Sequence, residues 1–147
     1  RTAYDATRKV GREILIEIIA SKAGPVDDTT TSRALSELYD AGLKPDWWKL
    51  EPQPSAAAWT NVDTVIETRD RYCRGVVMLG LEAPMDVLRA GFATAKASRT
   101  VRGFAVGRTI FADAAKAWFA GEMNDDAAIA EMARKFQELV DVWEENT

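Results

Sequence analysis

The chain has 147 residues, 47% of them apolar and 29% charged, which is typical of a single globular domain with a sizeable core. The net charge is −4 and no Lys/Arg cluster carries interleaved aromatic residues, so nucleic acid is not an expected partner. The apolar runs are far shorter than the roughly 20 residues that a membrane-spanning helix requires, so a membrane is not an expected partner either.

Four short apolar runs follow one another at intervals of roughly 30 residues, the length of a strand–helix unit. They predict strands at Glu13–Ile19, Trp47–Glu51, Gly75–Leu81 and Gly103–Arg108. Before the first run, Tyr4–Arg8 has the pattern of a helix end, and the chain opens on arginine rather than methionine. We therefore expect a piece cut from a longer polypeptide.

Each interval between the runs has a helical pattern with recognisable ends. The first helix is expected after the N-cap-rich segment Asp27–Ser32 and before Gly42, the second from Pro54, and the third from Pro84. Two final helices are predicted at about 110–121 and about 125–145, the second with the clearest apolar stripe in the chain. The tryptophans on apolar helix faces are expected in the core: Trp59, Trp118 and Trp143.

Alternating strands and helices indicate a parallel sheet with right-handed crossovers. An open doubly wound sheet normally shows a Gly-rich first turn, and G-x-G-x-x-G is absent here. A closed (β/α)8 barrel needs eight strands, of which this chain supplies four. We therefore predict an α/β fold in which residues 1–147 form one half-barrel domain, the C-terminal half of a TIM barrel.

Charged residues lie on two predicted strands that should be apolar. Side chains alternate between the faces of a strand, so Glu17 shares a face with Glu13, opposite an all-isoleucine face that should pack on helices. Lys49 and Glu51 likewise share a face of the second strand. Glu17 and Lys49 should therefore both point into the barrel near the C-terminal ends of their strands, where barrel active sites lie.

Lys49 has two interpretations. It could form an ion pair with Glu17 or Glu51 that only fills a polar barrel mouth. Alternatively, an amine held beside Trp47 and apolar neighbours has its charged form disfavoured, so it could act as a neutral Schiff-base nucleophile. Glu17 could then move protons.

The segment Gly107-Arg108-Thr109 ends the fourth predicted strand and begins a helix. A glycine permits close approach to the backbone, a helix N-terminus offers free N–H groups, and Arg108 adds a bidentate donor. Phosphate binds after the last two strands in many barrels, so this segment is a candidate phosphate site. The alternative is a tight turn whose arginine pairs with a local acid.

The sequence contains no histidine, which removes Ser–His–Asp and Cys–His nucleophile systems and His-bearing zinc sites. We expect neither a metal nor a cofactor. Cys73 is the single cysteine, so no intrachain disulfide can form and a cytoplasmic location is expected.

Four of these segments also bear a family resemblance. The Lys49 segment, PDWWKLEP, resembles the sixth-strand lysine segment of class I aldolases of the tagatose-bisphosphate type. Glu17 resembles the fifth-strand glutamate of that family, and Gly107-Arg108-Thr109 its eighth-strand phosphate grip. Taken in order, GREILIEII, KPDWWKLEP, YCRGVVMLGLEAP and RGFAVGRTIF more closely resemble the aldolase-like domain fused behind the sugar kinase (5-dehydro-2-deoxygluconokinase) of bacterial inositol catabolism.

The resemblance implies cleavage of 6-phospho-5-dehydro-2-deoxygluconate to dihydroxyacetone phosphate and malonate semialdehyde. It implies Lys49 as the Schiff-base residue, Glu17 as acid/base with Glu51 orienting Lys49, and Gly107, Arg108 and Thr109 around the substrate phosphate. The family domain is about twice as long as this chain, so the missing N-terminal half-barrel, or a second copy in a homo-oligomer, is an expected partner. The alternative function is a non-catalytic phosphosugar-binding or structural module that supports the fused kinase.

Overall fold

A computed structural model describes residues 1–145 of the chain. Its four strands form one parallel sheet in the order β1-β2-β3-β4, each joined to the next by a helix. The elements in chain order are α1 (Thr2–Lys9), β1 (Leu15–Ile18), a 3-10 turn η1 (Ala20–Lys22), α2 (Thr30–Asp40), β2 (Trp47–Leu50), α3 (Ala56–Arg69), β3 (Gly75–Leu79), α4 (Met85–Ala95), β4 (Val101–Ala105), α5 (Arg108–Phe119) and α6 (Asp125–Glu145). The predicted α/β class is confirmed, and this architecture is that of half of a (β/α)8 barrel.

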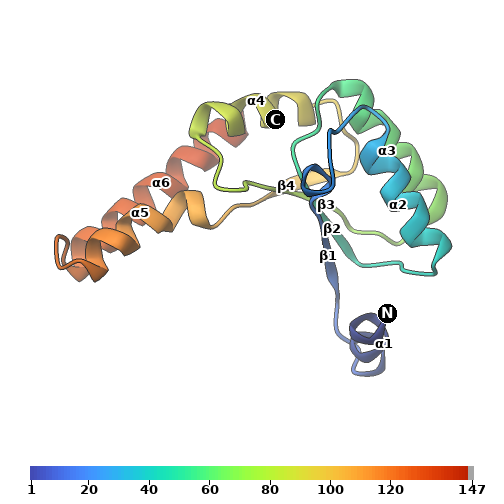
Figure 1. Ribbon diagram of the computed structural model, residues 1–147, viewed down its shortest axis with the longest axis horizontal. Coiled ribbons are helices and arrows are strands. Elements are labelled where there is room, and N and C mark those ends of the chain that lie inside the picture. Colours follow the sequence, from blue (N-terminus) through green and yellow to red (C-terminus); the bar gives the residue numbers. More distant parts are fainter. Residues whose placement is uncertain (146–147) are drawn as a thin grey trace.

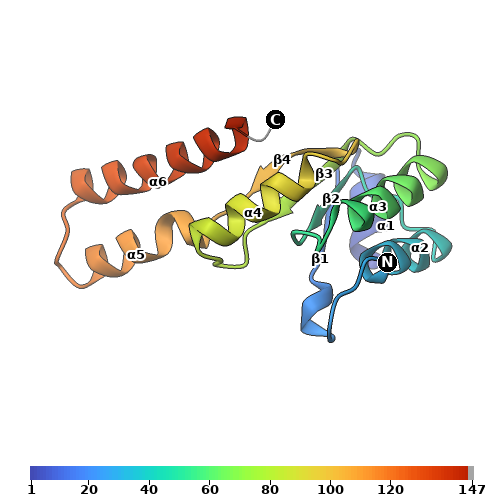
Figure 2. The ribbon, with the colours of Figure 1, turned by 90° about the horizontal axis from the view of Figure 1, so that it is seen from above.

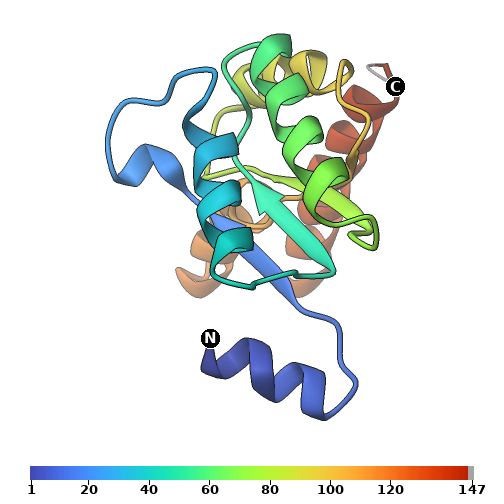
Figure 3. The same ribbon diagram turned by 90° about the vertical axis from the view of Figure 1, so that its right-hand side faces the viewer.

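The helices α2, α3 and α4 lie together on one face of the sheet, while no helix within residues 1–145 covers the opposite face (Figures 1 and 3). On the helix side, Trp48 and Leu50 of β2 are fully buried. On the other side, Leu15 of β1 is 45% exposed. The sheet is thus two-sided in the manner of a barrel wall, with an apolar outer face under helices and an inner face that bears the charged residues.

The core lies between the sheet and its helices. Trp48 donates its indole N–H to the Tyr39 hydroxyl at 2.8 Å, and the two rings meet edge to face with centroids 5.6 Å apart. Burial is the main cause that raises the pKa of Tyr39, which holds its hydroxyl neutral. The side chains that fill the rest of this layer include Leu35, Trp59, Val62, Val76, Met78, Leu88 and Phe92.

The last two helices form a hairpin that extends beyond the sheet (Figure 2). Near its C-terminal end, α6 packs against α4 and buries Leu139. Farther out the α5–α6 hairpin leaves several large apolar side chains exposed. Trp118 is one of them, at 43% exposure, so the prediction of a core position for it is wrong. Of the other predicted core tryptophans, Trp59 is fully buried and Trp143 packs against the core with its ring 5.3 Å from that of Phe92.

The fourth strand begins and ends earlier than Gly103–Arg108, the range predicted for it, because Thr100 is already attached to β3 through a bond from the Val76 N–H at 2.9 Å. Val76 pairs with Val101 but Val77 pairs with Gly103, so Arg102 is the extra residue of a bulge. Because Arg102 is charged and interrupts the apolar run, the sequence pattern places the start of this strand too late. The chain leaves the sheet after Ala105, and α5 therefore begins at Arg108 rather than Ile110.

A buried carboxyl group fixes this start of β4. Asp63 of α3 is fully buried and accepts from the Ser98 hydroxyl at 2.7 Å, the Thr100 hydroxyl at 2.6 Å and the Arg99 N–H at 2.8 Å. These bonds tie the loop after α4 to α3. The bonds of Asp63 therefore fix the position at which β4 begins, and with it the position of Arg108 at the C-terminal side of β4.

Candidate active site at the C-terminal ends of the strands

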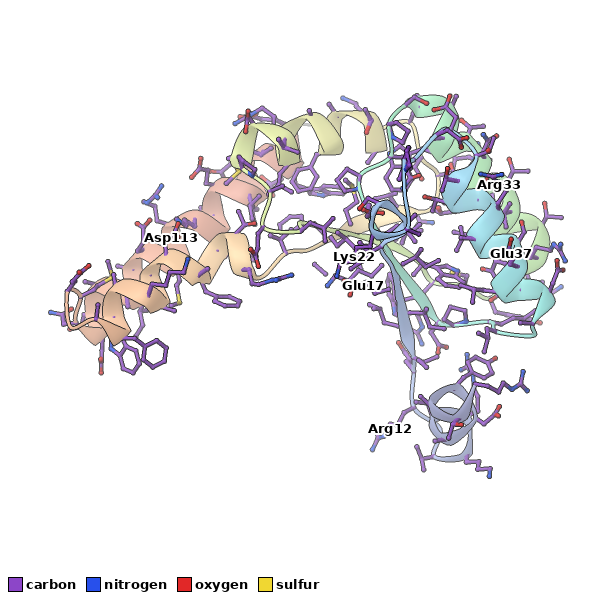
Figure 4. All side chains as sticks on the ribbon, in the orientation of Figure 1. Arg12, Glu17, Lys22, Arg33, Glu37 and Asp113 are labelled. Atoms are coloured by element: carbon purple, nitrogen blue, oxygen red, sulfur yellow. The ribbon has the colours of Figure 1, made fainter. Side chains whose placement is uncertain are left out.

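Glu17 and Lys49 are paired neighbours on β1 and β2, directly opposite each other in the parallel register. The Lys49 Nζ lies 2.9 Å from the Glu17 Oε1, with the two side chains 26% and 41% exposed respectively. Figure 4 shows Glu17 extending from β1 on the side away from Arg33 and Glu37 of α2. This is the arrangement that strand parity predicts, and it puts the carboxylate within proton-transfer distance of the amine.

A cavity of about 240 Å³ opens beside this pair. Its wall is built from the strand ends and from the loops that follow β3 and β4, as expected for a site at the C-terminal edge of a barrel. The residues that line it are Glu17, Ile19, Lys49, Leu79, Gly80, Leu81, Glu82, Ala105, Val106, Gly107, Arg108, Thr109 and Phe111. Five of the six predicted site residues therefore share one cavity, and Glu51 is the exception.

Glu51 is buried and bonded to the segment that follows β1. One of its carboxylate oxygens accepts from the Ser21 backbone N–H at 3.0 Å, and the other accepts from the Ser21 hydroxyl. Glu51 thus attaches η1 to the segment that follows β2. That Glu51 orients Lys49 stays a prediction. The available signal was Ser21 itself, a small polar residue shortly after the first predicted strand.

The backbone at the start of α5 forms the second side of the cavity. Gly107 occupies the N-cap position, and a side chain there would bring a Cβ to 3.2 Å from the Phe111 ring. The first N–H groups of a helix have no partner within the helix, so they give this end of the cavity a partial positive charge. Thr109 donates its hydroxyl to the Ala83 carbonyl at 3.3 Å, which holds the helix start against the loop after β3.

Arg108 forms an ion pair with Glu82, through its Nη1 and the Glu82 Oε1. Both side chains are more than half exposed, and both line the 240 Å³ cavity. Of the two interpretations of the Gly107-Arg108-Thr109 segment, the structure therefore shows the pairing of Arg108 with a local acid. The phosphate role stays a prediction.

Glu82 was missed by the sequence reasoning, and it lies in an unusual turn. Leu81 and Glu82 both have positive φ angles, +48° and +60°, and the Ala83 N–H bonds to the Gly80 carbonyl at 2.8 Å across them. At such positive φ angles, residues other than glycine are disfavoured by about 1–3 kcal/mol each. Gly80 packs so closely against Val106, the residue after β4, that an added Cβ would lie 2.8 Å from a Val106 methyl. The available signal was a glutamate directly after the apolar run Gly75–Leu81.

The described residues also bear on metal binding, on Cys73 and on membrane spans. Within residues 1–145, no group of three or more His, Cys, Asp or Glu side chains is arranged to hold a metal ion. Cys73 packs at the edge of the core, and burial raises the pKa of its thiol. In the same described residues, no helix is long and apolar enough to cross a lipid bilayer.

The fold and these side chains define the class: half of a (β/α)8 barrel with an amine, carboxylates and a guanidinium gathered at the C-terminal ends of its strands. The chain belongs to the family described as "Uncharacterized protein conserved in bacteria (DUF2090)", whose model matches residues 1–147. A comparison with curated proteins found no match. The function is therefore argued from the site itself.

Proposed function

We propose that this chain carries the Schiff-base lysine and the phosphate grip of a class I aldolase. The observation that supports the proposal most is the shared cavity, in which Lys49 and its carboxylate neighbour Glu17 face the Arg108 end of α5. A ketone bound between them would present its carbonyl to the amine and its anionic end to the guanidinium. The resemblance to the inositol-catabolism domain suggests 6-phospho-5-dehydro-2-deoxygluconate as the substrate.

The mechanism begins with a proton transfer from Lys49 to Glu17, across the 2.9 Å that separates the two groups. The neutral amine adds to the ketone carbon beside the phosphorylated carbon, and loss of water leaves an iminium ion. A base then takes the proton of the hydroxyl group β to the iminium carbon. The carbon–carbon bond breaks, its electron pair moves to the iminium, and malonate semialdehyde leaves.

The enamine that remains takes up a proton, and water releases dihydroxyacetone phosphate from Lys49. Throughout these steps Arg108 and the N–H groups at the start of α5 hold the phosphate. No metal or organic cofactor enters this scheme. The proposal places the protein in the cytoplasm, where a single cysteine stays reduced, as part of carbohydrate catabolism.

Covalent trapping tests the proposal. Incubation of the protein with dihydroxyacetone phosphate and borohydride should reduce an imine onto Lys49, and mass mapping should find the adduct on the peptide around Trp47–Glu51. Lys49→Met should abolish adduct and cleavage, and Lys49→Arg should do the same because a guanidinium stays protonated. Lys44→Met, an exposed position five residues earlier, is the matched control and should retain both.

An adduct on another residue, or cleavage that survives Lys49→Met, would contradict the aldolase assignment. The better assignment would then be the non-catalytic phosphosugar-binding or structural module. In that case Arg108 would still bind the phosphate, and the Lys49–Glu17 pair would only fill the polar mouth of the barrel.

A further inference from the structure

We propose that Glu82 is an internal competitor for the anion site: its carboxylate occupies Arg108 when no ligand is bound, and the phosphate group of a ligand displaces it. The inference rests on the proposed function, because that proposal assigns Arg108 to the phosphate. It adds a residue from the loop between β3 and α4 to the site. Neither the sequence pattern nor the family resemblance gives this residue a role.

The first support is the position of the carboxylate. Glu82 is paired with Arg108 at the start of α5, and both residues line the same cavity as Lys49. A carboxylate is itself an anion with hydrogen-bond acceptors, so Glu82 already fills the place that a phosphate oxygen would take on the guanidinium. The two anions cannot use the same N–H groups of Arg108 at once.

The second support is the backbone that delivers Glu82. Leu81 and Glu82 both adopt positive φ angles in the Gly80–Ala83 turn, although neither is glycine. Such a conformation persists only while surrounding contacts hold it. Here three contacts hold the turn: the Glu82–Arg108 ion pair, the close packing of Gly80 on Val106, and the bond from the Thr109 hydroxyl to the Ala83 carbonyl. Release of Glu82 removes the first of these, so the Glu82 end of the turn can relax when phosphate binds Arg108.

The third support is the exposure of the pair. The side chains of Arg108 and Glu82 are 61% and 54% exposed, so solvent and ions reach both. An exposed ion pair is weak, whereas a phosphate dianion brings more charge and more acceptor oxygens to the same guanidinium. Displacement by phosphate is therefore favourable, and Glu82 lowers the apparent affinity without preventing binding.

Calorimetric titration with inorganic phosphate and with dihydroxyacetone phosphate tests this competition. Glu82→Gln should bind both probes about two- to fivefold more tightly than the wild type, because the competing charge is gone. Glu67→Gln is the matched control: it makes the same charge change at an exposed glutamate paired with Arg99, and should leave both affinities unchanged. In an Arg108→Ala background, Glu82→Gln should no longer tighten binding.

Unchanged or weaker binding in Glu82→Gln would overturn the competition, since a residue that only orients Arg108 would give that result. The same holds if neither wild type nor variant binds phosphate at millimolar concentration. The borohydride trap at Lys49 keeps the two proposals separate. If Glu82→Gln binds phosphate more tightly but no imine forms at Lys49, the aldolase assignment is refuted and the competition by Glu82 stands. If an imine forms but Glu82→Gln does not bind phosphate more tightly, the competition is refuted and the aldolase assignment stands.

Discussion

Replacing Asp63 by alanine should strongly destabilise the protein, because this carboxyl group is fully buried and accepts hydrogen bonds from three consecutive residues. The Thr100 N–H also donates to Asp63, at 3.2 Å, which makes four donors, and two of these keep a partner after the change. The Thr100 N–H keeps the Ser98 hydroxyl at 3.2 Å as a partner, and the Arg99 N–H belongs to an exposed residue that water can reach. The bonds from the Ser98 and Thr100 hydroxyls to Asp63, at 2.7 and 2.6 Å, are lost, and the contact that remains between the two hydroxyls is long, at 3.5 Å.

A bond to a charged acceptor contributes about 1.5 kcal/mol or somewhat more, so the two lost bonds predict a fall of about 3 kcal/mol in the free energy of unfolding. For a chain of this size that corresponds to a thermal midpoint lower by about 6–12 °C. Circular dichroism during heating and in urea measures both quantities. Asp63→Asn keeps one acceptor oxygen and should give an intermediate loss.

Glu67→Ala is the matched control for Asp63→Ala. It lies one turn further along α3 and pairs with Arg99 at the surface, so its removal should hardly change the midpoint. Equal losses in the two variants, or a loss below about 1 kcal/mol in Asp63→Ala, would refute the argument that the buried carboxyl group fixes β4.

Three further predictions concern the ligand, the sheet edges and acid. Arg108→Ala should weaken a phosphorylated substrate by about 2–3 kcal/mol, or about 30- to 160-fold, and spare its unphosphorylated analogue; equal loss for both would make Arg108 structural. The chain should form dimers or larger species at micromolar concentration, because β1 and β4 leave two unpaired sheet edges; light scattering that shows a stable monomer would contradict this. Hydrogen bonds from the Thr29 N–H and the hydroxyls of Thr30 and Thr29 lower the pKa of Asp27 to about 2, so its contribution to stability is present above about pH 4 and lost as the pH falls to about 2. Asp27→Asn should remove this part of the acid sensitivity, so the stability difference between wild type and variant should be smaller at about pH 2.5 than at about pH 5. An equal difference at the two pH values would count against this prediction.

The sequence could predict the elements and their order because each strand–helix unit carries its own local signals. The strand β2 begins at Trp47 as predicted, and the final helix has the predicted bounds Asp125–Glu145. The N-cap of α3 is also local: Ser55 accepts from the Ala58 N–H at 3.1 Å. Strand parity was enough to place Glu17 and Lys49 on the same face, because alternation of side chains is a property of any strand.

The predictions failed or were incomplete where the position or burial of a residue depends on contacts with a distant part of the chain. The start of β4 depends on Asp63, whose bonds to the loop before β4 span more than thirty residues of sequence. The exposure of Trp118 depends on whether another element covers the α5–α6 hairpin, and the amphipathic pattern of a helix does not carry that information.

The parallel α/β class, the two-sided strands and the face on which Lys49 and Glu17 lie can be predicted from the amino-acid sequence, because periodicity and caps act over a few neighbouring residues. The bond between Glu51 and Ser21 and the ion pair between Glu82 and Arg108 are seen only in the folded chain. Both contacts join loops that follow different strands, and a parallel sheet brings those loops to one edge whatever their separation along the chain. Which of the side chains on that edge meet is set by register and turn geometry, here by the positive φ angles of Leu81 and Glu82.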